Sequence, residues 1–345
     1  MDYKIRVFRG FGSRDRIYIN GQVARGRADR QQHRAGDSKS RLWGRIRYAL
    51  KLAVSRRLPG CRLRISCAGT VTETQSDSHG HFSVSLRVTD QEVHTPWQSY
   101  RVELLEPTGP EPVAAEGVVL IAGEKAKRIV VSDIDDTIIY TGVANKAMML
   151  WRLFAHSARK KIPFPGIDAF FRGLHGGADG REANPLIYVS RSPWSIYPVL
   201  EEFFEMHQFP SGPVLQLREW GVTWRHPWPR RARSHKARLL TRISEMYPAH
   251  RFLLIGDSGQ RDPELYRDFA SHHPGRIDAV YLRDVGSNER RTRELAKIAD
   301  TLAELEVPVV ITDDTSQMAQ DALGRDFIQR SDLIASREDA ASQVK

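Results

Sequence analysis

Short apolar runs alternate with helical patterns through the second half of the chain, and this alternation limits its fold more than any other feature. Six apolar runs are predicted strands, at residues 129–132, 186–189, 213–217, 252–255, 277–282 and 307–311. The clearest predicted helices span residues 193–207, 234–246, 263–272 and 289–306. Strands that alternate with helices in this way form a doubly wound, mainly parallel sheet. We therefore expect an α/β domain over residues 123–327.

The first 122 residues follow a different pattern, in which short β-branched or alternating runs are separated by Gly, Ser and Asp turns. The predicted strands are 4–8, 15–24, 61–67, 69–74, 81–88, 100–105 and 113–121. Several short strands without helical periodicity between them are typical of a β-sandwich, so we expect a sandwich-like domain over residues 1–122. Residues 328–345 lose periodicity, and we expect a flexible tail there.

Positive charge is concentrated at the amino-terminal end of the chain. The net charge is +10, and the first 60 residues hold about 16 lysines and arginines against about four acidic residues. Such a segment, which includes a predicted helix at 42–54, suits an anionic membrane surface or nucleic acid. A plain solvated basic surface explains the charge equally well. We see no RNA-binding motif and no run of stacking aromatic residues, so nucleic acid is the less favoured partner.

Two further features indicate the class of protein and its compartment. No apolar run approaches the roughly 18 to 20 residues of a membrane span. The first residues interleave charged with apolar side chains, unlike a signal peptide, so we expect a cytoplasmic protein. Cys61 and Cys67 lie in one predicted strand, too far apart for a disulfide, and we expect two buried thiols.

Two carboxylates follow the predicted strand that ends at residue 132. Asp133, Asp135 and Thr137 form the pattern Asp-x-Asp-x-Thr directly after this apolar run. Ionised carboxylates are rarely buried unless they are paired or bind a metal, and open α/β sheets bind ligands at the carboxyl ends of strands. Paired acids also cap turns and helices, but the preceding strand and Thr137 favour a catalytic interpretation. The pattern resembles the nucleophile loop of haloacid-dehalogenase-like phosphohydrolases, which implies that Asp133 attacks phosphorus and Asp135 handles the leaving-group proton.

A group of polar residues follows the predicted strand at 186–189. Ser192 is a good helix N-cap, and Pro193 suits the first helical position. The free N–H groups and dipole of that helix would face the same sheet edge as Asp133 and favour a phosphate there. Ser190 would donate a hydrogen bond to a phosphoryl oxygen, although an ordinary capped helix is the alternative. The residues assigned to substrate binding are Thr137, Ser190, Arg191 and Ser192.

Asp257 and Asp262 place two more carboxylates directly after the apolar run at 252–255. Mg²⁺ prefers hard oxygen ligands in octahedral geometry and keeps several waters. The carboxylates of Asp133 and Asp257, with the backbone carbonyl of Asp135, would supply oxygens to Mg²⁺. Asp262 would either hold a metal-bound water or cap the helix that begins at residue 263, and the sequence favours neither.

Lys236 lies at the start of the helical pattern before this strand, where a lysine can reach over the sheet edge. It would stabilise negative charge on the nucleophile and on the transferred phosphoryl group. Most helical lysines are simply solvated, and three neighbouring basic residues compete for the role: Arg231, Arg233 and His235. In the mechanism that these roles imply, Asp133 attacks as an ionised carboxylate. Asp135 needs a raised pKa so that it can first protonate the leaving group, and it then acts as a base.

Four longer motifs, at residues 131–141, 184–197, 209–218 and 254–266, resemble the actin-patch-protein-type phosphatidate phosphatases. The resemblance covers about residues 128–325, and residues 8–13 and 19–23 look more loosely like bacterial members of that family. It implies Mg²⁺-dependent hydrolysis of phosphatidate to diacylglycerol and phosphate, at the inner face of the membrane if the basic segment docks on anionic lipid.

Two other functions remain open from the sequence. One is a phosphatase that acts on a soluble or nucleic-acid phosphate, because one fold and one catalytic set serve many phosphate esters. The other is an inactive scaffold that binds lipid or protein through its β-domain. The presence of Asp133, Asp135 and Asp257 argues against the scaffold.

Overall fold

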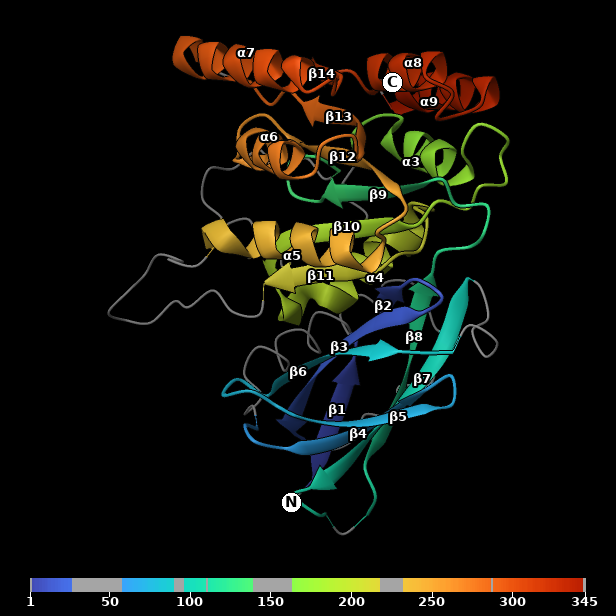
Figure 1. The fold of residues 1–345 in the computed structure, drawn as a ribbon. Helices are drawn as coiled ribbons and strands as arrows, with labels where there is room; N and C mark the ends of the chain where they lie inside the picture. The colour runs from blue at the N-terminus through green and yellow to red at the C-terminus, as the bar shows by residue number, and fades with distance from the viewer. Residues whose placement is uncertain are drawn as a thin grey trace. The chain divides into compact units, whose positions relative to one another are not determined.

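The computed structural model describes residues 2–26, 58–89, 96–109, 111–138, 163–217, 232–286 and 288–343, with only the backbone at 191–193, 195, 217, 232–235 and 342–343. The predicted helix at 42–54 and most of the basic amino-terminal segment lie outside these residues. The chain forms two compact units, whose main spans are residues 1–123 and 124–345 (Figure 1). None of the described helices is long and apolar enough to cross a membrane.

The first unit is a mixed β-sheet of eight strands. The strands are β1 (Tyr3–Val7), β2 (Gly10–Gly12), β3 (Arg16–Arg25), β4 (Arg62–Cys67), β5 (Thr70–Gln75), β6 (His81–Arg87), β7 (Trp97–Glu106) and β8 (Ala114–Ile121). Their order is β1-β3-β2-β8-β7-β4-β5, and β6 also pairs with β3. Neighbours are antiparallel except β2 and β8, which run parallel. The all-β prediction is therefore confirmed, but the strands belong to one continuous sheet instead of two separate ones.

The core of this sheet follows from alternation along its strands. In β4, Leu63 and Ile65 are buried whereas Arg62 and Arg64 are exposed, because successive side chains point to opposite faces. The same core takes residues from β1, β3, β6, β7 and β8, so strands from distant places in the order pack together. Cys61 and Cys67 are free and buried, as predicted, and burial raises the pKa of Cys67 to about 11.

The second unit contains a six-stranded parallel sheet. Its strands are β9 (Arg128–Asp133), β10 (Leu186–Pro193), β11 (Val214–Leu217), β12 (Arg251–Asp257), β13 (Ile277–Arg283) and β14 (Val309–Thr312). Their order is β11-β10-β9-β12-β13-β14, and every neighbouring pair is parallel. The chain first builds outward from β9 to β11 and then from β12 to β14 on the other side. Ligands bind at the carboxyl ends of strands where the order reverses in this way, here between β9 and β12.

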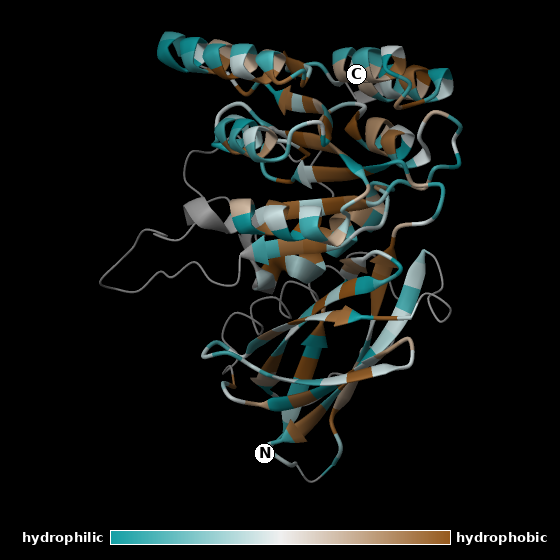
Figure 2. Cartoon of the chain, viewed as in Figure 1, coloured by the Kyte–Doolittle hydropathy of each residue, from teal (hydrophilic) through white to brown (hydrophobic). Residues whose placement is uncertain are grey.

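Seven described helices accompany this sheet. They are α3 (Ile167–Gly176), α4 (Tyr197–Met206), α5 (Ala232–Met246), α6 (Asp262–His272), α7 (Glu289–Glu304), α8 (Thr315–Gly324) and α9 (Arg330–Gln343). Figure 2 shows apolar residues concentrated in the strands and hydrophilic residues along α7. Side chains of β12 are buried from Phe252 to Asp257 without alternation, as expected for a parallel strand covered on both faces. The predicted α/β architecture is confirmed.

The helix that we predicted from residue 193 begins later. β10 continues to Pro193, a short 3₁₀ turn spans Trp194–Ile196, and α4 starts at Tyr197. Pro193 pairs with Leu217 of β11 after a shift of register, and a strand end or irregularity tolerates a residue without an N–H group. The prediction of Ser192 as a helix cap was therefore wrong.

Residues 330–343 form helix α9 instead of the flexible tail that we expected. Leu333 and Ser336 are buried, and the Ser336 hydroxyl donates a hydrogen bond to the Gly166 carbonyl over 3.0 Å. A Cβ atom on Gly166 would lie 2.2 Å from the Ser336 carbonyl oxygen, so the two backbones approach closely. The contact uses small residues, which give no stripe of large apolar side chains, and sequence periodicity therefore missed it.

Candidate active site

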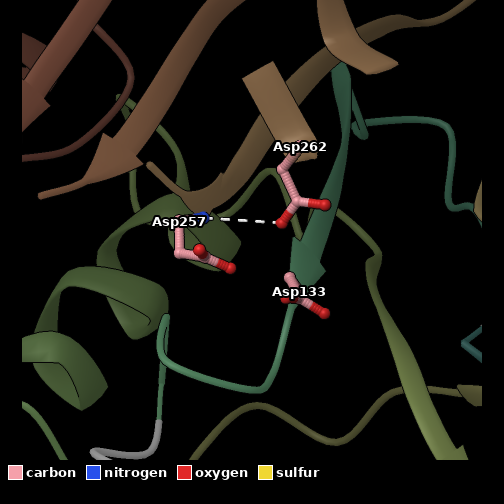
Figure 3. Close-up of side chains that lie close together, drawn as sticks. All are labelled: Asp133, Asp257 and Asp262. Atoms are coloured by element: carbon pink, nitrogen blue, oxygen red, sulfur yellow. Dashed lines mark hydrogen bonds between the residues drawn. The ribbon is translucent and has the colours of Figure 1, made fainter. Parts of the chain in front are cut away.

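Three buried carboxylates converge at the point where the strand order reverses (Figure 3). Asp133 ends β9, Asp257 ends β12, and Asp262 is the first residue of α6. Each offers a carboxylate oxygen within 4.8 Å of the others. Asp262 can lie close to β12 because residue 256 is glycine: a Cβ atom at residue 256 would lie 2.7 Å from both Cβ and Oδ2 of Asp262. Sequence reasoning had placed Asp133 and Asp257 at one sheet edge and had left Asp262 open between a metal-bound water and a helix cap.

Lys236 lies between two of these carboxylates. Its Nζ atom is 3.0 Å from Oδ1 of Asp133 and 2.6 Å from Oδ1 of Asp262. Its side chain is 8% exposed, so this lysine is a buried cation on the fifth residue of α5 and not a solvated one. Among the four basic candidates at this helix start, the side chains of Arg231, Arg233 and His235 lie outside the described residues.

Burial and nearby negative charge raise the pKa of two of these carboxyl groups, Asp133 and Asp257. Burial is the main reason that the pKa of Asp133 lies well above its usual range; Lys236 opposes this shift, and Asp262, Asp135 and Asp257 add to it. The pKa of Asp257 rises to about 7, chiefly through burial and then through the charge of Asp262. One lysine therefore does not neutralise the cluster, and the site favours a further cation.

The described oxygen atoms fit a hard metal ion. Oδ2 of Asp133 and Oδ2 of Asp257 are buried and receive no hydrogen bond from the described residues, and Oδ1 of Asp133 forms the ion pair with Lys236. Buried acceptors are normally satisfied, so such oxygens have the character of ligand atoms. An all-oxygen donor set suits Mg²⁺ better than a soft metal. Asp262 contacts Lys236 and accepts the Asp257 N–H at 3.4 Å, which favours a role at the site over a role as a plain helix cap.

Asp135 lies beside the cluster, and its carboxylate is not one of the three. Oδ2 of Asp135 accepts a hydrogen bond from the Ser190 hydroxyl over 3.2 Å. Its carbonyl, which we expected to bind metal, accepts a hydrogen bond from Nε2 of Gln260 at 3.3 Å. Thr137 is buried, and its hydroxyl has no hydrogen-bond partner among the described residues. Ser190 thus contacts the predicted proton donor directly, whereas Arg191 and Ser192 have side chains outside the described residues.

The family described as phosphatidate phosphatase APP1, catalytic domain, matches residues 128–284, which include the three carboxylates and Lys236. Residues 128–284 are therefore similar to this catalytic-domain family.

Two curated relatives are similar to part of the chain. Phosphatidate phosphatase APP1 of Saccharomyces cerevisiae is 30% identical over 154 residues, which cover 44% of this chain and 25% of the yeast protein. An uncharacterized protein of Schizosaccharomyces pombe is 30% identical over 161 residues, or 46% of this chain and 25% of its own length. The chain therefore spans about a quarter of the length of these relatives.

Among solved structures, a carbohydrate acetylesterase from Xanthomonas citri aligns with 88% of this chain and 66% of its own at 10% identity. The TM-score of that alignment is 0.31, which is too low to support any argument about fold or function.

Gln260 is a residue of the catalytic domain that sequence reasoning missed. Its backbone N–H donates to Oδ1 of Asp257 over 2.6 Å, and its side chain donates to the Asp135 carbonyl. It therefore links the loop after β12 to the loop after β9. A neutral glutamine in a polar loop carries no sequence pattern that would have indicated this position.

Proposed function

We propose that this protein is a Mg²⁺-dependent phosphatidate phosphatase that forms an aspartyl-phosphate intermediate on Asp133. The main support is the cluster itself: Asp133 ends a central strand of a domain in the phosphatidate phosphatase family, beside Lys236 and two further carboxylates. The yeast relative bears the name phosphatidate phosphatase, but the chain spans a quarter of it, so the substrate is part of the proposal. The reversal of strand order at β9 supports a haloacid-dehalogenase-like form of the α/β fold.

Mg²⁺ would be held by Asp133 and Asp257, with Asp262 bound directly or through a water. When bound, it would supply the positive charge that the cluster lacks and that phosphoryl transfer requires. Lys236 supplies a second positive charge from within the chain, in contact with Asp133. Burial raises the pKa of Asp133, and both positive charges would oppose that shift and favour the ionised nucleophile.

In the first step an Asp133 carboxylate oxygen bonds to phosphorus, and the bond from phosphorus to the glycerol oxygen breaks. Asp135 gives its proton to that leaving oxygen, which yields diacylglycerol. In the second step Asp135 takes a proton from water as the water oxygen attacks phosphorus, and this releases phosphate and free Asp133. The Ser190 hydroxyl, which donates to Oδ2 of Asp135, would orient this carboxyl group for the proton transfer.

We infer that the substrate is presented at a membrane surface. The support is the excess of Lys and Arg in the first 60 residues, together with a family whose yeast relative is named for a lipid substrate. Anionic lipid attracts such basic segments by about 1 kcal/mol per residue near the surface. A cytoplasmic protein attached peripherally to the inner face of the membrane fits this charge distribution.

The test is phosphate release from phosphatidate in detergent mixed micelles by the purified protein, with and without Mg²⁺. We expect a rate that follows the surface concentration of phosphatidate, no activity after chelation, and restoration by Mg²⁺. The variant Asp133→Asn should remain folded and lose at least about a hundredfold in rate, since an amide is a poor nucleophile and ligand. Faster cleavage of a sugar phosphate, nucleotide or nucleic-acid phosphate than of any phospholipid would replace the lipid proposal.

A further inference from the structure

Arg291 of α7 contacts the loop that joins the two carboxylates Asp257 and Asp262. Its Nε atom donates to the Ser258 carbonyl over 2.9 Å, and Nη2 donates to the Gln260 carbonyl over 2.6 Å. The remaining face of the guanidinium binds Glu264 of α6, with Nη1–Oε1 at 2.6 Å and Nη2–Oε2 at 3.2 Å. Arg291 lies beyond residues 128–284, to which the family match extends. This arginine therefore holds part of the candidate site from outside the matched region.

The contacted residues determine where the carboxylates lie. Gln260, whose carbonyl Arg291 binds, donates its own N–H to Oδ1 of Asp257 over 2.6 Å. Ser258 follows Asp257 directly, and its N–H bonds to the Arg283 carbonyl at 2.8 Å. The loop from 258 to 261 belongs to neither strand nor helix, so no ladder of regular hydrogen bonds fixes it. Its backbone position depends on individual contacts, and Arg291 provides two of them.

The chemistry of these contacts requires an arginine. Two carbonyl oxygens and two carboxylates, those of Glu264 and, at 3.4 Å, Glu294, receive donors from one planar group. The flexible single ammonium of lysine cannot reproduce that fork. The Arg291 side chain is 16% exposed, so its contacts are largely shielded from water. The hydrogen bonds to Glu264 raise the pKa of Arg291, which keeps the group charged at any ordinary pH.

We propose that Arg291 is a positioning residue for the metal site, which fixes Asp257 and Asp262 through the carbonyls of Ser258 and Gln260. The proposal rests on the Mg²⁺ site of the proposed function. It predicts that the guanidinium fork, and not positive charge on α7 alone, sets the affinity of the cluster for a divalent cation. A purely structural link between α6 and α7 through Glu264 would instead change global stability and leave the affinity of the folded protein unaltered.

Three full-length variants separate these alternatives. Arg291→Ala removes every contact, and Arg291→Lys keeps the charge without the fork. Arg290→Ala is the matched control, because this neighbouring side chain is 86% exposed and pairs with Glu294 at 3.1 Å. The measurements are Mg²⁺ affinity by calorimetry, hydrogen exchange of residues 256–262 in metal-free protein, thermal unfolding, and phosphatase rate at varied Mg²⁺.

We expect Arg291→Ala to weaken Mg²⁺ binding by about 10- to 100-fold, as is usual when the support of a metal ligand is removed. Its rate should recover largely at saturating Mg²⁺, and exchange should quicken in residues 256–262 more than elsewhere. Arg291→Lys should retain most of the defect, and Arg290→Ala should resemble the parent.

Unchanged loop exchange in Arg291→Ala, an affinity within about twofold of the control, or full recovery in Arg291→Lys would overturn the proposal. If the parent protein itself binds no Mg²⁺, the proposed function fails separately, and the exchange measurement in metal-free protein still tests the positioning role. Glu264→Gln is a fourth variant, which tests the proposal even if Arg291→Ala does not fold. It keeps the two carbonyl contacts, so it should alter stability more than Mg²⁺ affinity, and the reverse result would contradict the role of the carbonyls.

Discussion

Gly256→Ala tests the geometry of the carboxylate cluster without removing any charged group. The new Cβ atom would lie 2.7 Å from both Cβ and Oδ2 of Asp262 and 3.0 Å from the ring of Tyr266. Carbon atoms in contact are normally about 3.5–4.0 Å apart, so Asp262 must move by roughly 1 Å. Tyr266 cannot yield easily, because it is buried and its hydroxyl donates to the Ile255 carbonyl over 2.8 Å. The strain therefore falls on Asp262 and on its 2.6 Å contact with Lys236.

Two effects of different size follow from this displacement. Overpacking of a well-filled interior costs about 1–3 kcal/mol of unfolding free energy, which urea denaturation measures directly. A displacement of about 1 Å at a catalytic constellation costs on the order of 100-fold in rate. We therefore expect a folded variant with a clear stability loss, a much larger activity loss, and weaker Mg²⁺ binding by calorimetry.

Gly324→Ala is the matched control for this substitution. Gly324 ends α8, and a Cβ atom there meets nothing within 4 Å. Alanine at such a helical position should stabilise by roughly 0.4–1 kcal/mol and leave activity unaltered. The reasoning about Asp262 is refuted if Gly256→Ala keeps its stability within about 0.5 kcal/mol of the parent and its full rate.

Two further predictions concern charge. Burial and the charge of Asp262 raise the pKa of Asp257 to about 7, whereas a carboxyl group in the unfolded chain has a pKa of about 4. Between these pH values the metal-free folded state binds a proton that the unfolded state has lost. The free energy of unfolding should therefore fall as pH rises from about 4 to about 7. Urea unfolding in a chelator should show a smaller fall for Asp257→Asn, and equal slopes would count against the assignment. Lys236→Met leaves two buried carboxylates without their cation and should cost about 3–5 kcal/mol at pH 8. The loss should be smaller near pH 5, because burial raises the pKa of Asp133 and protonation of Asp133 removes one charge that needs Lys236. A loss of the same size at both pH values would mean that charge is not its cause.

The parallel sheet could be predicted from sequence because its strands are buried on both faces. A run such as 252–255 is apolar throughout, and the structure extends it only to Arg251–Asp257. Helix α9 could not be found in the same way, since its contact with Gly166 uses Ser336 and a close backbone approach. The start of α4 was misplaced because Pro193 satisfies the rules for a strand end as well as those for a first helical residue.

The residues of the candidate site were also predictable only in part. Asp133, Asp257 and Lys236 were predicted together because strand ends and helix starts meet at one edge of a parallel sheet, and side chains with charge are visible in a sequence. The roles of Gln260 and Arg291 depend on backbone groups, which every residue carries and which therefore leave no pattern. The choice for Asp262 between a cap and a site residue required its distance to Lys236.

The balance of charge in the carboxylate cluster supports the proposed cation site. Asp133, Asp257 and Asp262 are each at most 2% exposed, and Lys236 provides the one positive charge that contacts two of them among the described residues. Ionising all three without further compensation is unfavourable, because buried charges need partners. Protonation of these carboxylates would avoid the cost of burying uncompensated charge, but it would remove the anionic oxygens at the ends of β9 and β12. An asparagine at each position would serve a purely structural role with less destabilisation. Three buried carboxylates around one lysine are therefore the arrangement expected of the divalent cation site that we propose beside Asp133.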